Sequence, residues 1–354
     1  MSKISVAVLG ATGMIGQRFI QMLEDHPWFE IEGLYASERS SGKRLGDVLK
    51  VRDHEYLDET VERRIETMDV GKISESCKVA FSGIPSDLAG PTETQLAEAG
   101  VAVFTNAGSH RMDPHVPIVI PEVNPSHMEA ARDQETYGES GGYIITNANC
   151  SSTGIAAPLH AINRAFTLEE VFVSTYQALS GAGYPGVPSL DAVGNVVPFI
   201  SHEEEKMETE LAKMLGVYAG SEFRYAPFKV MANCARVPVV DGHLESLVLE
   251  LADSPSLEEL EQCLVSFRGE PQRLGLPSAP EQPIIVRREE NRPQPVFDAM
   301  AGRPARARGM AVTVGRLREG NGYYKAFAMS HNTIRGGAGG SVLNAELAKA
   351  KGML

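Results

Sequence analysis

Residues 143–154, YIITNANCSSTG, contain the change of secondary structure on which we expect the fold to depend. Residues 143–146 are β-branched or aromatic, which is typical of a strand covered on both faces. Helix-capping residue types follow at 151–153, and apolar residues then recur at helical spacing as far as Phe166. The stretch therefore predicts a buried strand, a turn and a helix, with Cys150 at the start of the helix.

Cys150 has two interpretations. At a helix N-terminus, free N–H groups and the helix dipole stabilise an anion, so we expect its thiol to ionise readily and act as a nucleophile. A lone cysteine can also be a small buried hydrophobic residue. The strand-to-helix junction favours the nucleophile without deciding between the two.

The composition limits the possible partners. The chain has 354 residues, of which 43% are hydrophobic and 22% charged, which suits two globular domains. A formal net charge of -13 argues against nucleic acid and anionic membranes, because both require a basic surface.

The four cysteines (Cys77, Cys150, Cys234 and Cys263) are widely spaced, with no CxxC pair and no histidine cluster nearby. We therefore expect neither a zinc site nor a disulfide framework, and a reducing cytoplasm fits best.

No apolar run reaches the roughly 18 residues of a membrane helix, and the N-terminus lacks a signal-peptide pattern. These features predict a soluble protein that is not exported.

A glycine-rich loop follows the first predicted strand. Residues 4–9 are apolar, residues 10–16 read GATGMIG, and a helical pattern begins directly afterwards. Glycines between a strand and a helix allow a tight turn and close approach of the backbone to a pyrophosphate. The spacing GxxGxxG departs from the common GxGxxG, so we interpret it as a variant cofactor loop; a plain tight turn is the alternative.

The second predicted strand, residues 31–36, ends in SERSSGK at residues 37–43. Cationic and hydroxyl side chains here suit the 2′-phosphate of NADP better than the ribose hydroxyls of NAD. On residue types alone, a solvated basic loop explains the segment equally well.

Further alternation of strands and helices, with strands at 78–84 and 101–106, predicts an α/β fold with a doubly wound parallel sheet of Rossmann type. Ser82, Asn106 and Cys150 fall at or near the carboxyl ends of strands, where ligands of such sheets bind. Arg111 is either an anion ligand or an exposed loop charge.

The pattern changes after the Cys150 helix and predicts a second α+β domain with a mixed sheet. Residues 202–216 predict a helix with a polar, solvated face, and residues 230–240 and 243–251 predict strands joined as a hairpin by Asp241-Gly242. His243 is then either structural or a general acid/base, with Arg236 as an anion ligand beside it.

Residues 268–308 predict an extended connection, and strands follow at 310–317 and 323–330. A glycine-rich turn at 332–340 leads into a last helix, which we expect to return to the first domain. The predicted division is 1–149 with 333–354 for cofactor binding and 150–332 for catalysis and dimerisation.

Together these features suggest a reaction in which a thiolate attacks a carbonyl, hydride passes to or from a nicotinamide, and a thioester reacts with a second nucleophile. The histidine would move the protons.

The chain also resembles the aspartate-β-semialdehyde dehydrogenase family, specifically its archaeal and fungal branch, along nearly its whole length. The matching segments are GATGMIGQRF, ASERSSGK, PSDLAG, IPEVNP, NANCSSTG, SGAGYPGVPS, EEEKMETE, RVPVVDGHLES, RPQP and HNTIRGGAGGSVLNAE. The resemblance implies NADP-dependent, phosphate-dependent interconversion of L-aspartate 4-semialdehyde and L-aspartyl 4-phosphate, run reductively in lysine, threonine and methionine biosynthesis.

The same resemblance implies residue roles. Cys150 would be the nucleophile, His243 the acid/base catalyst and Arg236 the ligand of the substrate carboxylate. Glu203 would bind the substrate amino group, although Glu204 and Glu205 are alternatives, and Lys206 and Arg111 would bind phosphate. The implied cofactor ligands are Thr12, Gly13, Met14, Ile15, Ser37, Arg39, Ser40, Ser82, Ser180, Gly181 and Asn332.

Family members form dimers or tetramers through the sheet of the second domain, so the resemblance implies a homodimer or homotetramer. Two rival readings remain open: a malonyl-CoA reductase on the same scaffold, and a non-catalytic NADP-binding protein. N-acetyl-γ-glutamyl-phosphate reductase is a poorer match in the HEEEK and RVPVVDGH segments.

Overall fold

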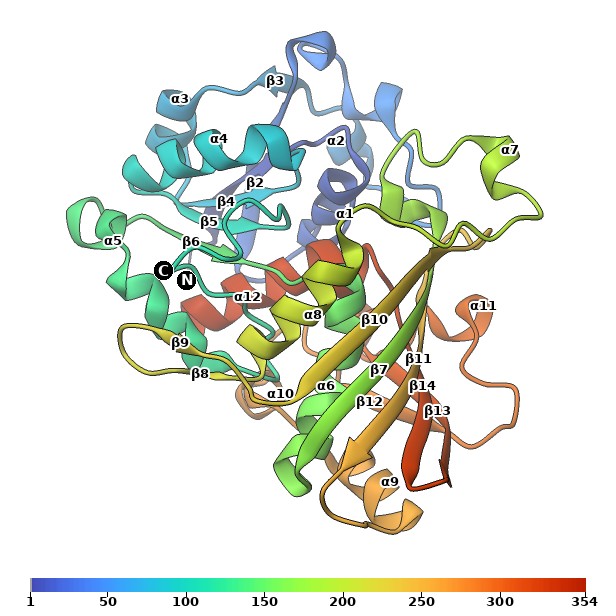
Figure 1. Ribbon diagram of the computed structural model, residues 1–354. Helices are drawn as coiled ribbons and strands as arrows, with labels where there is room; N and C mark the ends of the chain where they lie inside the picture. The colour runs from blue at the N-terminus through green and yellow to red at the C-terminus, as the bar shows by residue number, and fades with distance from the viewer. Residues whose placement is uncertain (1) are drawn as a thin grey trace.

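Strand β1 (Ile4–Leu9) lies near the centre of a six-stranded sheet in which every pairing is parallel (Figure 1). The structure is a computed structural model that describes residues 2–354. The strand order β3-β2-β1-β4-β5-β6 is that of a doubly wound dinucleotide-binding sheet. The other strands are β2 (Phe29–Ala36), β3 (Ile65–Thr67), β4 (Val79–Ser82), β5 (Ala102–Thr105) and β6 (Tyr143–Thr146).

Helices cover both faces of this sheet, which explains why β1, β4, β5 and β6 are almost continuously apolar. Val6 and Val8 pack into one core with residues of α1 and α12, while Ala7 and Leu9 pack into another with residues of α3 and α4. The helices of this half are α1 (Met14–Leu23), α2 (Asp58–Val61), α3 (Val70–Ser76), α4 (Ser86–Glu98), α5 (Glu135–Glu139) and α12 (Gly339–Ala350).

The glycine loop has the geometry that its sequence requires. Gly10 adopts φ +78°, and a Cβ on Gly16 would lie 2.0 Å from the Gly10 carbonyl oxygen. Only glycine permits both the left-handed turn and the contact of α1 with the end of β1.

The second half contains a mixed sheet with the strand order β10-β7-β11-β14-β13-β12. Helix α6 (Cys150–Ala165) packs against this sheet, and α8 (Glu203–Met214) packs against β10. The predicted fold class, a Rossmann-type sheet with a second mixed-sheet α+β region, is confirmed. The strands are β7 (Leu168–Gln177), β10 (Lys229–Arg236), β11 (His243–Leu251), β12 (Ile284–Arg287), β13 (Val312–Gly320) and β14 (Tyr323–Ser330).

The predicted hairpin at Asp241-Gly242 is wrong. Strand β7 lies between β10 and β11, parallel to the first and antiparallel to the second. The connection 237–242 instead crosses the end of β7 and accepts hydrogen bonds from the N–H groups of Leu179 and Ser180. Asp241-Gly242 does form a turn, with Gly242 at φ +95°. The strand that pairs with β10, however, is β7, about 60 residues earlier in the chain, and the local sequence of a turn does not determine which strand pairs beside it.

The connection at 268–308 is more structured than its composition predicts. It contains β12 and the short helices α10 (Glu270–Leu274) and α11 (Pro295–Asp298), and it follows α9 (Leu257–Ser266). The remaining short elements are α7 (Ser189–Ala192), β8 (Val217–Tyr218) and β9 (Phe223–Arg224). Strand β12 was not predicted because four residues are too short for a periodic signal.

The last helix, α12, packs against α1 and β5 and contributes to the core of the N-terminal half (Figure 1, red). A buried ion pair between Arg335 and Glu122, with Nη2 2.7 Å from Oε2, holds the turn that precedes this helix. Within residues 2–354, no helix is both long and apolar enough to cross a membrane.

Candidate active site

A cavity of about 760 Å³ lies between the carboxyl ends of the parallel strands and the second half of the chain. Both halves therefore contribute to one site, as expected at the edge of a doubly wound sheet. The residues of the predicted site that line it are Thr12, Gly13, Met14, Ile15, Ser37, Arg111, Cys150, Ser180, Gly181, Glu203, Lys206 and Asn332.

Five predicted site residues do not line this cavity. Arg39 and Ser40 lie in a short 3₁₀ turn outside it, and the buried Ser82 hydroxyl donates to Glu93 Oε1 over 2.5 Å. Arg236 and His243 are buried directly behind Gly181, where a Cβ would lie 2.7 Å from Arg236 Nη1 and 3.0 Å from His243 Cε1. Only the backbone of Gly181 therefore lies between these two side chains and the cavity.

Cys150 and His243 meet across the two halves of the chain. Cys150 is the first residue of α6 and His243 the first of β11, and Cys150 Sγ lies 3.2 Å from His243 Nε2. The Ala178 N–H donates to His243 Nδ1 over 3.0 Å. Because Nδ1 accepts, neutral His243 carries its proton on Nε2 and directs this N–H toward the sulfur.

The expectation that Cys150 ionises readily does not fit its surroundings. Burial, followed by the nearby Glu203 carboxylate, raises the pKa of the Cys150 thiol to about 12, against the opposing effect of Arg236 and Arg111. The helix N-terminus contributes less than predicted, because Asn149 is the N-cap and its Oδ1 already accepts from the N–H groups of Ser151 and Ser152. Cys150 borders the cavity, so water on that side moderates the effect of burial.

His243 is also uncharged at rest. Complete burial lowers the pKa of His243 well below its usual range, and the neighbouring Arg236 guanidinium acts in the same direction. The Ala178 N–H facing Nδ1 further disfavours a second ring proton. The resting pair is therefore a thiol beside a neutral imidazole rather than a thiolate–imidazolium ion pair.

Glu203 is held at the cavity by three side chains. Its Oε2 accepts from Asn149 Nδ2 over 2.8 Å and from Gln177 Nε2 over 3.2 Å, while Oε1 pairs with Lys206 Nζ at 3.1 Å. The structure also distinguishes the three consecutive glutamates. Glu204 accepts from the Cys234 N–H on β10 and Glu205 is exposed, so only Glu203 borders the cavity.

Arg111 is buried, and three of its N–H groups already donate to acceptors within the protein. Its Nε donates to Asn147 O, Nη2 donates to Asn106 O, and Nη1 pairs with Glu210 Oε1 at 2.8 Å. A guanidinium has five N–H donors, so two remain to bind an anion in the cavity.

Helix α8 has a buried charged face rather than the solvated face predicted for it. Glu210 Oε2 accepts the Asn149 N–H over 2.7 Å, and Lys213 Nζ donates to the carbonyl oxygens of Arg111 and Val116. Burial lowers the pKa of Lys213 to about 8. Glu203 and Glu210 are seven residues apart and Lys213 follows three residues later, and each of the three contacts at least one segment distant in sequence.

Several contributing residues were not identified from the sequence. Gln177 orients Glu203, and Gly336 is required because a Cβ there would lie 2.8 Å from Cys150 Cα. Lys50 lines the cavity and its Nζ lies 4.2 Å from the centre of the Tyr184 ring, which joins the two halves at the cavity. Only the glycine-rich run at 336–340 offered a signal in advance.

These observations define a class: a two-domain oxidoreductase with a dinucleotide-binding sheet and a cysteine–histidine pair at its edge. Comparison with known protein families agrees. Residues 5–131 match the NAD binding domain of semialdehyde dehydrogenases, and residues 157–335 match their dimerisation domain.

Full-length relatives share the same arrangement. Aspartate-semialdehyde dehydrogenase from Methanothermobacter thermautotrophicus is 47% identical over 97% of this chain and 98% of its own length, and that from Aspergillus fumigatus is 40% identical over 99% of both. The crystal structure of the Candida albicans enzyme with NADP superimposes with a TM-score of 0.88, at 39% identity over 100% of both chains. The chain belongs to the aspartate-semialdehyde dehydrogenase family.

The position of Glu203 predicts how readily Cys150 reacts. Glu203→Gln removes a negative charge near the thiol, so the pKa of Cys150 should fall and iodoacetamide should alkylate it several-fold faster at pH 8. The rate is measured by mass spectrometry of the Cys150 peptide in the cofactor-free protein. Glu204→Gln is the matched control and should leave the rate unchanged, since Glu204 faces β10. Equal rates in both variants would show that Glu203 does not influence the thiol.

Proposed function

We propose that this protein interconverts L-aspartate 4-semialdehyde and L-aspartyl 4-phosphate with NADP and inorganic phosphate, through a thioester at Cys150. The observation that carries the proposal is the 3.2 Å contact between Cys150 Sγ and His243 Nε2 at the end of the cofactor cavity. We infer that it works reductively in the cytoplasm, in lysine, threonine, methionine and diaminopimelate biosynthesis. The four cysteines are all free, which suits a reducing compartment.

The cavity suits a dinucleotide. The N-terminus of α1 and the turn at Gly10 leave room for a pyrophosphate beside Thr12, Gly13, Met14 and Ile15. Ser37 lines the cavity after β2, in the region where a 2′-phosphate would lie. Arg39, two residues later in the short 3₁₀ turn, would supply the positive charge beside it. Bound NADPH would supply the hydride of the reaction.

Cys150 and His243 can carry the covalent steps. Cys150 Sγ attacks C4 of the aspartyl phosphate while the thiol proton passes to the departing phosphate, which leaves with the electrons of the C–O bond, and a thioester forms. When hydride reaches the thioester carbon, His243 acts as the acid by donating a hydrogen bond from Nε2–H to the developing oxyanion, and the proton stays on the ring because its loss would leave an imidazolate. The oxyanion then re-forms the carbonyl, the C–S bond breaks, and the aldehyde leaves as the Cys150 thiolate is restored and takes up a proton from solvent.

The charged groups at this end of the cavity divide between substrate and phosphate. Arg236 would hold the α-carboxylate, because its buried guanidinium uses only Nη1 for the Ala178 carbonyl and has donors left for a bidentate contact. Glu203 would accept from the substrate amino group. Lys206 and the two free donors of Arg111 would bind phosphate.

A second copy of the chain is a further expected partner. The mixed sheet packs α6 against one face, while its other face carries Phe172, Tyr176, Met231, Leu244 and Val248 at least partly exposed. We propose that this open face forms a homodimer, with a homotetramer as the larger alternative.

Turnover and its dependence on phosphate test the activity directly. With L-aspartate 4-semialdehyde and NADP, the protein should form NADPH only when inorganic phosphate is present. Cys150→Ser should lower the rate at least a thousandfold while NADPH binding, measured by fluorescence, stays within twofold. Cys263→Ser, at a partly buried cysteine on α9, is the control and should retain the parent rate.

The rival functions give different results in this assay. Oxidation of NADPH by malonyl-CoA, without turnover of the semialdehyde, would assign the chain to the thioester reductases. NADPH binding without turnover of either substrate would leave a non-catalytic NADP-binding protein.

Substitution of Arg236 tests the carboxylate contact. Arg236→Lys keeps the charge but not the planar fork, so KM should rise and kcat should fall, each about tenfold or more, because the grip also orients the reacting carbonyl. Steady-state kinetics measure both constants. Unchanged kinetics would remove Arg236 from the substrate site.

If the open face of the mixed sheet forms the dimer interface, a charge added to that face should prevent dimerisation. Phe172→Glu should convert the dimer into a monomer, because the carboxylate would be buried without a partner between two copies. Sedimentation velocity at micromolar concentration gives the mass. Lys78→Glu, on the opposite half of the chain, is the control. A monomeric parent protein would contradict the proposal.

A further inference from the structure

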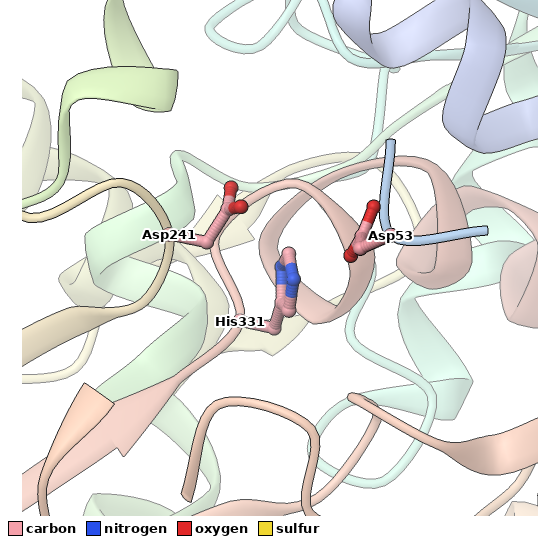
Figure 2. Close-up of side chains that lie close together, drawn as sticks. All are labelled: Asp53, Asp241 and His331. Atoms are coloured by element: carbon pink, nitrogen blue, oxygen red, sulfur yellow. The ribbon is translucent and has the colours of Figure 1, made fainter. Parts of the chain in front are cut away.

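A second cluster of ionisable side chains lies beside the active site and has no part in the chemistry described above. Figure 2 shows Asp53, Asp241 and His331 directed toward one another, and their ligand-type atoms lie within 4.8 Å of each other. They come from three separate segments: the loop before α2, the connection between β10 and β11, and the residue after β14.

Two carboxylates and an imidazole would suit a cation, and the chain supplies that cation itself. Arg18, on α1, is 1% exposed; its Nη1 donates to Asp53 Oδ1 over 2.8 Å, and its Nη2 lies 3.9 Å from Asp241 Oδ2. Burial, with Arg18 second, lowers the pKa of His331 to about 4, so the imidazole adds no positive charge. The guanidinium supplies positive charge beside both carboxylates and so balances the local charge.

Arg18 also contacts the other segment that reaches the active site. Its Nε donates to Thr333 Oγ1 over 3.1 Å. Thr333 follows Asn332, whose Oδ1 accepts the Gly242 N–H over 2.9 Å and whose Nδ2 donates to Ser180 Oγ over 2.8 Å. One guanidinium therefore donates a hydrogen bond to the 332–333 turn and lies within ion-pair distance of Asp241, while the hydrogen bond between Gly242 and Asn332 joins these two segments directly.

Both segments are immediate neighbours of the reacting groups. Asp241 lies two residues before His243, and Gly242 between them has φ +95° with Met329 filling the space where a Cβ would be. The connection is thus closely packed and can transmit a displacement of Asp241 to the His243 ring. At the other end, Arg18 lies one helical turn after Met14, which is part of the glycine loop.

We propose that Arg18 is a positioning residue for the acid/base step. Through its hydrogen bond to Thr333 and its electrostatic attraction to Asp241, it fixes the His243 ring relative to Cys150 and to the cofactor loop at the start of α1. This inference rests on the proposed function only in assigning His243 its role as the acid that contacts the developing oxyanion.

The experiment compares Arg18→Lys, which keeps the charge but loses the fork, with Asp241→Asn, which keeps the shape but loses the charge. Both should lower kcat about tenfold or more, while KM for the semialdehyde and the Kd of NADPH stay within about threefold. Both should also shift the pH dependence of Cys150 alkylation, because the His243 Nε2–H that stabilises the thiolate is displaced.

A matched control separates this effect from the loss of any arginine. Arg44 pairs with Asp47 and Glu62 on the surface of the same half of the chain, so Arg44→Gln should leave kcat and the alkylation profile unchanged. Thermal unfolding of every variant, followed by circular dichroism, shows whether the comparison is made on folded protein.

Three results would overturn the proposal: parent-like kcat in Asp241→Asn, a loss of kcat with an unchanged alkylation profile, or turnover of the parent that requires added Zn²⁺ or Mg²⁺ and is abolished by EDTA. The last would make the cluster a metal site. If the parent lacks turnover with L-aspartate 4-semialdehyde, the proposed function fails, yet the alkylation profile still tests Arg18, because it needs no substrate.

Discussion

The contact between Cys150 and His243 is the constraint on which the rest of the structure depends, since it joins the first residue of α6 to the first residue of β11. Neither side chain is positioned by its own element alone. Asn149 caps α6 and so fixes the start of the helix, where Cys150 lies. The Ala178 N–H fixes the tautomer and the orientation of the His243 ring. Because these groups lie so close together, positions 181 and 336 require glycine: a Cβ at 181 would collide with Arg236 and His243, and one at 336 would collide with Cys150.

Buried charges hold the two halves of the chain around this contact. Helix α8 reaches the parallel sheet through Glu210, which pairs with Arg111, and through Lys213, which caps carbonyl oxygens of the same loop. These charges are costly to bury alone, so both contacts of α8 penalise arrangements in which the halves move apart. The pairs Arg18–Asp53 and Arg335–Glu122 instead hold segments of the N-terminal half together.

The resting protonation of the site follows from the same burial. The pKa of the Cys150 thiol is raised and that of His243 is lowered, so the pair is neutral before a ligand arrives. A neutral thiol is a poor nucleophile and resists oxidation. In the proposed reaction, pairing of Glu203 with the substrate amino group would let the cationic groups around the cavity favour the thiolate. Substrate and nucleophile would then be activated together.

Some features followed from the sequence because they have local causes. The strand, glycine turn and helix at residues 4–23 need only apolar periodicity and the freedom of Gly10, and the same holds for the strand and helix around Cys150. Motif order indicated the family. The cofactor loop, Cys150, His243, Arg236 and Glu203 were therefore named in advance, although their roles stay predictions.

Tertiary structure decided what depends on segments distant in the chain. Asp241-Gly242 predicted a hairpin, yet β7 separates β10 from β11, because a two-residue turn signal carries no information about which strand lies alongside. The charged face of α8 looked solvated, yet its partners lie about 100 residues earlier. Cys150 met the sequence criteria for a thiolate, but burial and the Asn149 cap, both consequences of packing, make it a thiol. The sequence by itself determined the elements and the reacting residue types; the packing of the two halves determined their neighbours, their protonation and the place of Arg18.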